Sequence, residues 1–275
     1  MLGPYAPVDL HLHSTASDGA STPAQVVERA AERGVRTIAL CDHDTIDGVR
    51  PAQAAGAELG VTVLPGVELT CYWRERSVHM LAYGFEPENA DLAADLAHRR
   101  GIRERHIGRI LDRLAQLGMT LDHRRLIELA DNAVVGRPLI AKALVDAGHA
   151  PDSRTAFERW LRKGRPAYFA PSEPQSPIEA IALLHRIGAI AVLAHPMLDR
   201  NLDLIDELAT HNLDGLEAWH ARHTAEDSAR LNRWAERRGL LVTGGSDNHG
   251  PQQLPGIGEV WVPAEVVAGL TARRC

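Results

Sequence analysis

Short apolar segments alternate with capped helical segments along most of the chain, and this alternation limits the available folds more than any other feature. Residues 8–13 have the period of a strand, and Thr22 then begins a helix, with proline next to it and Gln25 as its capping-box partner. The same order returns late in the chain, where Ser176 begins a helix that precedes the apolar segment 189–194. Strands that alternate with helices predict a mostly parallel α/β sheet or barrel.

Seven apolar segments are expected to be strands, with helices between most of them. They are residues 8–13, 36–41, 61–64, 78–83, 189–194, 215–218 and 240–243. The stretch from about 88 to 170 breaks the alternation, and in it we expect helices at 91–117, 138–147 and 153–163 and a strand at 166–169. We therefore expect a barrel of residues 1–87 and 171–275, with an α-helical insertion of residues 88–170 that covers the active site.

Charge and cysteine content exclude several classes of protein. The net charge of −6 over 275 residues argues against binding of long nucleic acid through a broad basic surface. Three cysteines without a C-x-x-C pair support neither a thiolate zinc site nor a disulfide scaffold. No apolar run reaches the roughly 18 residues of a membrane span, and the first residues lack a secretory pattern. We expect a cytoplasmic protein that does not bind membranes.

Histidines and acids recur at the ends of the predicted strands or interrupt them. The candidates are His11, His13, Asp18, His43, Glu68, His79, His195, Asp247 and His249. His11 and His13 are two residues apart on a strand, so both project to one face. Each candidate alone has an ordinary structural explanation, such as a turn, a helix cap or a satisfied core histidine. Nine together, where α/β folds place catalytic groups, predict a site for several zinc, manganese or iron ions.

The motifs that carry these residues resemble those of the PHP (polymerase and histidinol phosphatase) family. They are Asp9-Leu-His-Leu-His-Ser14, Asp18-Gly19, Cys41-Asp-His-Asp44, Gly66-Val-Glu68, His79, Ala194-His-Pro196 and Gly245-Ser-Asp-Asn-His249. The resemblance implies a distorted (β/α)7 barrel with up to three divalent metal ions, manganese first and zinc or iron as alternatives. It assigns one ion to His11, His13, Glu68 and Asp247, a second to Glu68, His79 and His195, and a third to Asp18, His43 and His249.

Within that family the chain looks most like stand-alone phosphoesterases that carry a helical insertion and act on nucleotides. The likeness lies in Gly136-Arg-Pro138, Gly164-Arg-Pro-Ala-Tyr168 and Glu217-Ala-Trp-His-Ala-Arg-His-Thr224. It implies removal of the 3′-phosphate from nucleoside 3′,5′-bisphosphates, or 5′–3′ trimming of short oligonucleotides. The expected partner is thus a small phosphorylated nucleotide or a short oligonucleotide, while the oligomeric state stays open.

A phosphate ester repels nucleophiles, so the chemistry requires cations, an activated water and a proton for the leaving oxygen. Candidate acid–base groups are His223, Asp18 and His195, with His220 left open. A second anionic group on the substrate needs fixed cations, for which Arg137, Lys163 and Arg165 are candidates, with His223 as a further substrate contact. Three alternatives remain: a small-molecule phosphatase of the histidinol-phosphate type, a non-catalytic metal-binding domain and, more distantly, a metallohydrolase that acts on amide bonds.

Overall fold

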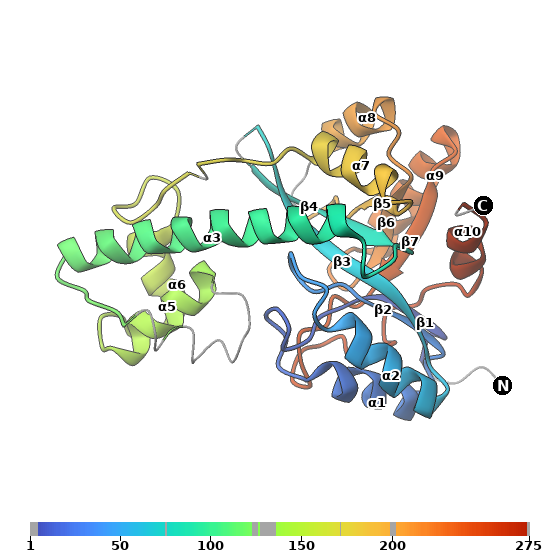
Figure 1. The fold of residues 1–275 in the computed structure, drawn as a ribbon, viewed down its shortest axis with the longest axis horizontal. Helices are drawn as coiled ribbons and strands as arrows, with labels where there is room; N and C mark the ends of the chain where they lie inside the picture. Colours follow the sequence, from blue (N-terminus) through green and yellow to red (C-terminus); the bar gives the residue numbers. More distant parts are fainter. Residues whose placement is uncertain are drawn as a thin grey trace. The chain divides into compact units, whose positions relative to one another are not determined.

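The computed structural model describes residues 5–74, 76–122, 126, 136–170, 172–198 and 202–273. Seven strands form one sheet in chain order, and Figure 1 labels them on the ribbon. They are β1 (Val8–Leu12), β2 (Thr37–Leu40), β3 (Thr62–Trp73), β4 (Arg76–Tyr83), β5 (Ile190–Leu193), β6 (Gly215–His220) and β7 (Leu241–Gly245). The pairs β1–β2, β2–β3, β5–β6 and β6–β7 are parallel, whereas β4 is antiparallel to both of its neighbours.

The sheet nearly closes on itself where the chain after β7 returns to β1. The backbone N–H of Asp247 donates to the His11 carbonyl at 2.8 Å, and that of His13 donates to the Asn248 carbonyl at 3.1 Å. Gly245 permits this approach, because a Cβ there would lie 2.4 Å from the His11 nitrogen. The strands therefore form a nearly closed seven-stranded barrel, which confirms the predicted fold class.

Helices surround the strands of this barrel (Figure 1). They are α1 (Pro23–Glu32), α2 (Val49–Leu59), α7 (Pro177–Arg186), α8 (Leu202–Thr210), α9 (Ala225–Arg238) and α10 (Glu265–Arg273). The capping boxes predicted at Thr22 and Ser176 are both formed, and Thr224 forms a third with Asp227. Val27 of α1 and Ile38 of β2 are fully buried in one apolar cluster, which fixes α1 against the sheet.

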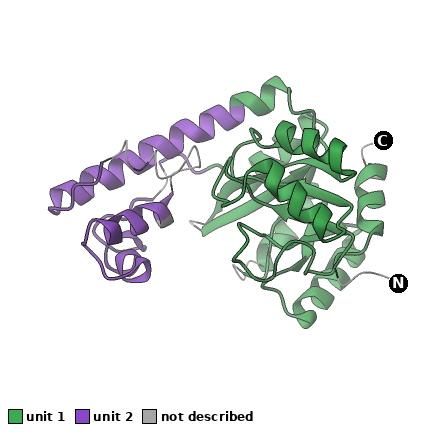
Figure 2. Cartoon of the chain, turned by 90° about the horizontal axis from the view of Figure 1, so that it is seen from below, with its two compact units in different colours: residues 1–94, 175–275 green, residues 95–174 purple. Residues whose placement is uncertain are grey.

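The remaining helices belong largely to a second compact unit. Unit 1 comprises residues 1–94 and 175–275 and unit 2 comprises residues 95–174 (Figure 2). The helices are α3 (Ala90–Gln116), α5 (Arg137–Asp146), α6 (Ser153–Ala156) and the π-helical turn η1 (Phe157–Leu161). Unit 2 has its own apolar core, which includes Ile110, Leu114, Ile140 and Leu144. No described helix is both long and apolar enough to cross a membrane.

Three details of the predicted secondary structure are wrong. Residues 166–169 form a turn followed by irregular backbone rather than a strand, because the N–H of Ala167 donates to the Trp160 carbonyl and that of Tyr168 to the Arg165 carbonyl. The helix expected at 153–163 is split between α6 and η1. Glu68 lies within β3 rather than beyond its end, because antiparallel pairing of Gly66–Trp73 with β4 extends that strand past Pro65.

Candidate metal centre

Glu68 lies at the centre of a group of histidines inside the barrel. Its side chain is only 1% exposed, and both of its oxygens face imidazole nitrogens. Oε2 lies 3.2–3.3 Å from nitrogens of three rings, those of His11, His13 and His43. Oε1 lies 2.8 Å from Nδ1 of His79 and 3.1 Å from Nε2 of His195. One carboxylate therefore joins five histidines that come from separate parts of the chain.

A second carboxylate, Asp247, joins the same group from the segment after β7. Its Oδ1 lies 3.1 Å from Nε2 of His13 and 3.5 Å from Nε2 of His11. The ligand atoms of His11, His13, Glu68 and Asp247 all lie within 4.8 Å of one another. Asp247 and His195 have positive φ angles of 51° and 27°, a strained conformation for side chains of this kind. The fold holds these two groups in the site at a conformational cost.

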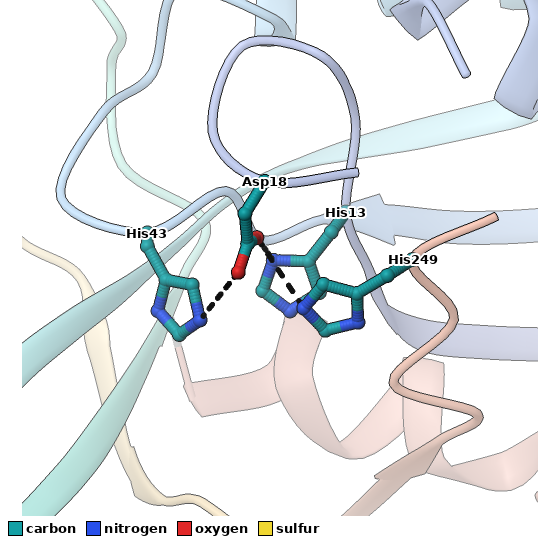
Figure 3. A group of neighbouring side chains, drawn as sticks. All are labelled: His13, Asp18, His43 and His249. Atoms are coloured by element: carbon teal, nitrogen blue, oxygen red, sulfur yellow. Dashed lines mark ion pairs between the residues drawn. The ribbon is translucent and has the colours of Figure 1, made fainter. Parts of the chain in front are cut away.

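Asp18 forms the centre of an adjoining group, which Figure 3 shows with His13, His43 and His249 around it. Its Oδ1 lies 3.3 Å from Nε2 of His249 and 3.6 Å from Nδ1 of His13, and its Oδ2 lies 3.8 Å from Nε2 of His43. The Asp18 side chain is 45% exposed, so this group is the more open of the two. His13 faces both Asp18 and Glu68, and the two groups are therefore continuous.

The donor set and its hydrogen bonding fit divalent metal ions. Both ring nitrogens of His13 and Nδ1 of His43 are buried and make no hydrogen bond within the described part of the chain, although carboxylate oxygens lie close by. Buried polar atoms are rarely left in this state unless something else binds them. Imidazole and carboxylate donors that converge from several sides suit zinc, manganese and iron. The residues present therefore fit more than one cation.

Burial and the neighbouring charged groups perturb the pKa values of this group in the metal-free protein. Burial lowers the pKa of His13, but the carboxylates of Asp247, Glu68 and Asp18 outweigh it and raise that pKa from 6.5 to about 10. Burial likewise raises the pKa of Glu68, but the surrounding imidazoles hold it well below its ordinary value. Without metal, the cluster therefore keeps a protonated His13 beside ionised carboxylates at neutral pH.

This shift predicts a pH dependence for the stability of the metal-free protein. A pKa raised by folding gives stability that is complete below pH 6.5 and is lost as the pH rises toward about 10. The free energy of unfolding in EDTA, measured by urea titration, is thus expected to fall between these values. His13→Gln is expected to flatten the fall. Equal slopes for the two proteins would contradict the assigned role of His13.

Two further buried groups at this site, Glu217 and His220, are not among the nine predicted ligands, and His220 is named above only as an open acid–base candidate. Glu217 is fully buried in β6, and one of its oxygens lies 2.9 Å from Nδ1 of His11. His220 is 3% exposed, and its Nε2 lies 3.2 Å from Oδ2 of Asp247. The signal available in the sequence was the one that identified Glu68, an acid between apolar residues, here in Gly215-Leu-Glu-Ala218.

The other candidates are His223 of unit 1 and three basic residues of unit 2. His223 follows β6, its Nδ1–H donates to the Ala218 carbonyl at 3.0 Å, and its ring centroid is 5.2 Å from that of His220. Arg137 begins α5 in unit 2, with its guanidinium carbon 5.7 Å from the Phe157 ring centroid and 5.9 Å from that of Tyr168. Lys163 and Arg165 follow η1 in the same unit.

Comparison with known proteins gives a family and several relatives. The family model described as the PHP domain matches residues 9–164. A 5′-3′ exoribonuclease of Haemophilus influenzae is 35% identical over 88% of this chain and 90% of its own length. A 3′,5′-nucleoside bisphosphate phosphatase of Chromobacterium violaceum is 36% identical over 90% and 88%. A phosphoribosyl 1,2-cyclic phosphate 1,2-diphosphodiesterase of Eggerthella lenta is 36% identical over 91% and 97%.

One solved structure matches nearly the whole chain. It is a protein of Bifidobacterium adolescentis described as a metal-dependent phosphoesterase, with a TM-score of 0.85 and 34% sequence identity. The match covers 97% of this chain and 96% of that one. The likeness therefore includes both compact units and not the barrel strands alone.

Proposed function

The chain belongs to the PHP domain family and is a metal-dependent phosphoesterase, and we propose that it removes the 3′-phosphate from nucleoside 3′,5′-bisphosphates. Trimming of short oligonucleotides from the 5′ end is the proposed second reaction, supported by the name of the exoribonuclease relative. We further propose that up to three divalent ions, manganese first and zinc or iron as alternatives, occupy the histidine cluster. The small-molecule phosphatase of the histidinol-phosphate type becomes the competing outcome of the test below.

One observation carries the proposal, the position of Glu68 between five imidazoles inside the barrel. A buried carboxylate that faces nitrogens on both oxygens is suited to bridge two cations. Divalent ions bound there would neutralise phosphate oxygens and lower the pKa of water. The nine proposed ligands are His11, His13, Asp18, His43, Glu68, His79, His195, Asp247 and His249.

The leaving ribose oxygen needs a proton, for which we propose His223, Asp18 and His195 as acid–base candidates. Burial raises the pKa of Asp18, but His249, His43 and His13 outweigh it and lower that pKa, which favours a carboxylate that binds cations or accepts protons. Burial lowers the pKa of His223, and its Nε2 makes no hydrogen bond among the described residues. We therefore propose that the neutral His223 ring takes up a proton at Nε2 and passes it to the leaving ribose oxygen.

A substrate comparison with manganese-loaded protein tests the proposal. Adenosine 3′,5′-bisphosphate is expected to be hydrolysed to 5′-AMP with a kcat/KM about 10- to 100-fold above that of histidinol phosphate. The reason is that a charge-assisted contact to the second phosphate contributes about 1.5–3 kcal/mol. Phosphate release and chromatography of the nucleotide products measure it. Faster turnover of histidinol phosphate would overturn the proposed substrate, as would a clear preference for a 1,2-cyclic phosphodiester.

The same assay tests Arg137, which we propose binds the second phosphate together with Lys163 and Arg165. Arg137→Ala is expected to remove most of the advantage of the bisphosphate while leaving turnover of adenosine 3′-monophosphate nearly unchanged. Arg159→Ala is the matched control, because its guanidinium also lies against an aromatic ring of unit 2, 5.9 Å from the Trp160 centroid. An equal loss in the two variants would exclude a specific role for Arg137.

A further inference from the structure

Glu217 contacts the ring of His11 on the side that faces away from Glu68. One of its oxygens accepts a hydrogen bond from Nδ1–H of His11 at 2.9 Å, and the other accepts one from the backbone N–H of His195 at 2.8 Å. An ionised carboxylate only accepts hydrogen bonds, so in the neutral imidazole of His11 the proton is on Nδ1. The lone pair of Nε2 then faces Glu68 Oε2 at 3.3 Å and Asp247 Oδ1 at 3.5 Å.

His220 acts in the same way on a carboxylate ligand. Its Nδ1 accepts the backbone N–H of Arg222 at 3.1 Å, so in the neutral ring Nε2 carries the proton. Nε2–H donates to Oδ2 of Asp247 at 3.2 Å. This bond leaves the other oxygen of Asp247, Oδ1, directed at His13. Glu217 thus orients Nε2 of His11, and His220 orients Oδ1 of Asp247. Neither Glu217 nor His220 takes the place of the atom that it orients.

A bulge in β6 brings Glu217 and His220 to the same side. Residues three apart on a regular strand point to opposite faces of the sheet. In the pairing of β6 with β7, Glu217 is opposite Thr243 but Trp219 is already opposite Gly244, so β6 contains one additional residue at this point. A Cβ at Gly244 would lie 2.5 Å from the Trp219 carbonyl oxygen, so glycine is required beside the bulge. Bulges commonly redirect side chains next to active sites.

We infer that Glu217 and His220 are positioning residues of the metal centre, which hold His11 and Asp247 in the orientations that one cation requires. The inference rests on the proposed function, because it concerns the ligands of the same ions. Neither residue has to touch the substrate. Partners of this kind orient a ligand and keep it in the tautomer that binds metal, and their loss lowers metal affinity by roughly 10- to 100-fold.

Metal binding by Glu217→Gln tests the inference. The amide keeps the size of the carboxylate but turns its NH₂ group either to the His195 N–H, which loses its acceptor, or to His11 Nδ1, which favours the tautomer with the proton on Nε2. Titration calorimetry with Mn²⁺ is expected to show affinity roughly 10- to 100-fold weaker than in the unsubstituted protein. The visible absorption bands of the Co²⁺-loaded protein are expected to shift, because the geometry around the ion changes.

Asp214→Asn is the matched control. Asp214 lies directly before the first residue of β6, at the end of the strand opposite to His220. One of its oxygens accepts hydrogen bonds from His185 Nε2 at 2.8 Å and from the Ala191 backbone N–H at 2.9 Å. It therefore has the same kinds of partner as Glu217 but lies outside the cluster. Mn²⁺ affinity and the Co²⁺ bands are expected to stay unchanged in this variant. An equal loss of affinity in both variants would show a structural role for Glu217 and overturn the inference.

The remaining outcomes separate the inference from the proposed function. Unchanged Mn²⁺ affinity in Glu217→Gln, with normal binding by the unsubstituted protein, would overturn the inference alone. Failure of the unsubstituted protein to bind Mn²⁺, Zn²⁺ or Fe²⁺ would overturn the proposed function with it. If Glu217→Gln does not fold, His220→Ala decides the matter. It removes the donor to Asp247 together with the acceptor of the Arg222 N–H, and a Mn²⁺ affinity equal to that of the unsubstituted protein would contradict the inference.

Discussion

Glu68→Gln is expected to reduce phosphate ester hydrolysis by at least about 10³-fold, the largest effect of any substitution considered. Glu68 faces five imidazoles at 2.8–3.3 Å, and it is a proposed ligand of two ions. Glutamine keeps the shape but removes the negative charge and one acceptor. Loss of a single donor that stabilises transition-state charge already costs about 10²–10³-fold, and under the proposal two ions would share the carboxylate that glutamine replaces. Steady-state kinetics at saturating Mn²⁺ measures the loss.

The loss must be separated from unfolding. Thermal unfolding of Glu68→Gln should remain a single transition, and its bound metal, measured by elemental analysis, should fall. Glu259→Gln is the control, since Glu259 is a partly exposed glutamate of unit 1 whose ion pair with Arg33, at 3.2 Å, lies outside the cluster. Activity in Glu68→Gln within about tenfold of the unsubstituted protein would be incompatible with a bridging carboxylate.

Removal of metal is expected to abolish activity, and its return is expected to restore it. In the metal-free cluster, burial lowers the pKa of His13, but Asp247, Glu68 and Asp18 outweigh burial and raise that pKa to about 10. The ring is then protonated and must lose a proton before it can bind a metal ion. After dialysis against EDTA, hydrolysis should fall by at least about 10²-fold. Addition of Mn²⁺ at about 100 times its Kd should also stabilise the fold by about 2.7 kcal/mol.

Parallel additions of Mn²⁺, Zn²⁺ and Fe²⁺ show which ion supports the highest turnover, with Mn²⁺ expected first. Mg²⁺ serves as a comparison, because it prefers oxygen ligands to imidazole. Calorimetry should detect protons released on binding, since the histidines must lose them. Full activity in the presence of EDTA, with no metal left by elemental analysis, would contradict this prediction.

Much of the fold could be predicted from the sequence because its signals are local. A capping box such as that of Thr22 depends on four consecutive residues, and the apolar segment 189–194 can only be buried. The prediction of a strand at 166–169 was wrong because the N–H of Ala167 donates a hydrogen bond to the Trp160 carbonyl. Apolar composition does not reveal such a contact. The length of β3 could not be predicted from the sequence either, because its second half is a strand only through its pairing with β4.

The site residues could likewise be predicted where the signal is local in the sequence, and not where it depends on contacts between distant segments. The spacing of His11 and His13 predicts that both side chains project from the same face of a strand. The place of His43 directly after a strand predicts that it lies at the site. That His13 would face both Asp18 and Glu68 depends on barrel closure and cannot be read from spacing. Glu217 was overlooked because its role depends on the bulge in β6, which exists only in relation to β7.

The central claim is that Glu68 and its surrounding histidines hold divalent ions. A crystal structure of the manganese-loaded protein, with anomalous data collected at the manganese edge, tests it most directly. We predict at least two anomalous peaks, each about 2–2.5 Å from an oxygen of Glu68 and from a nitrogen of one of its neighbouring histidines. An active, manganese-loaded crystal with no peak within that distance of Glu68 would contradict the account.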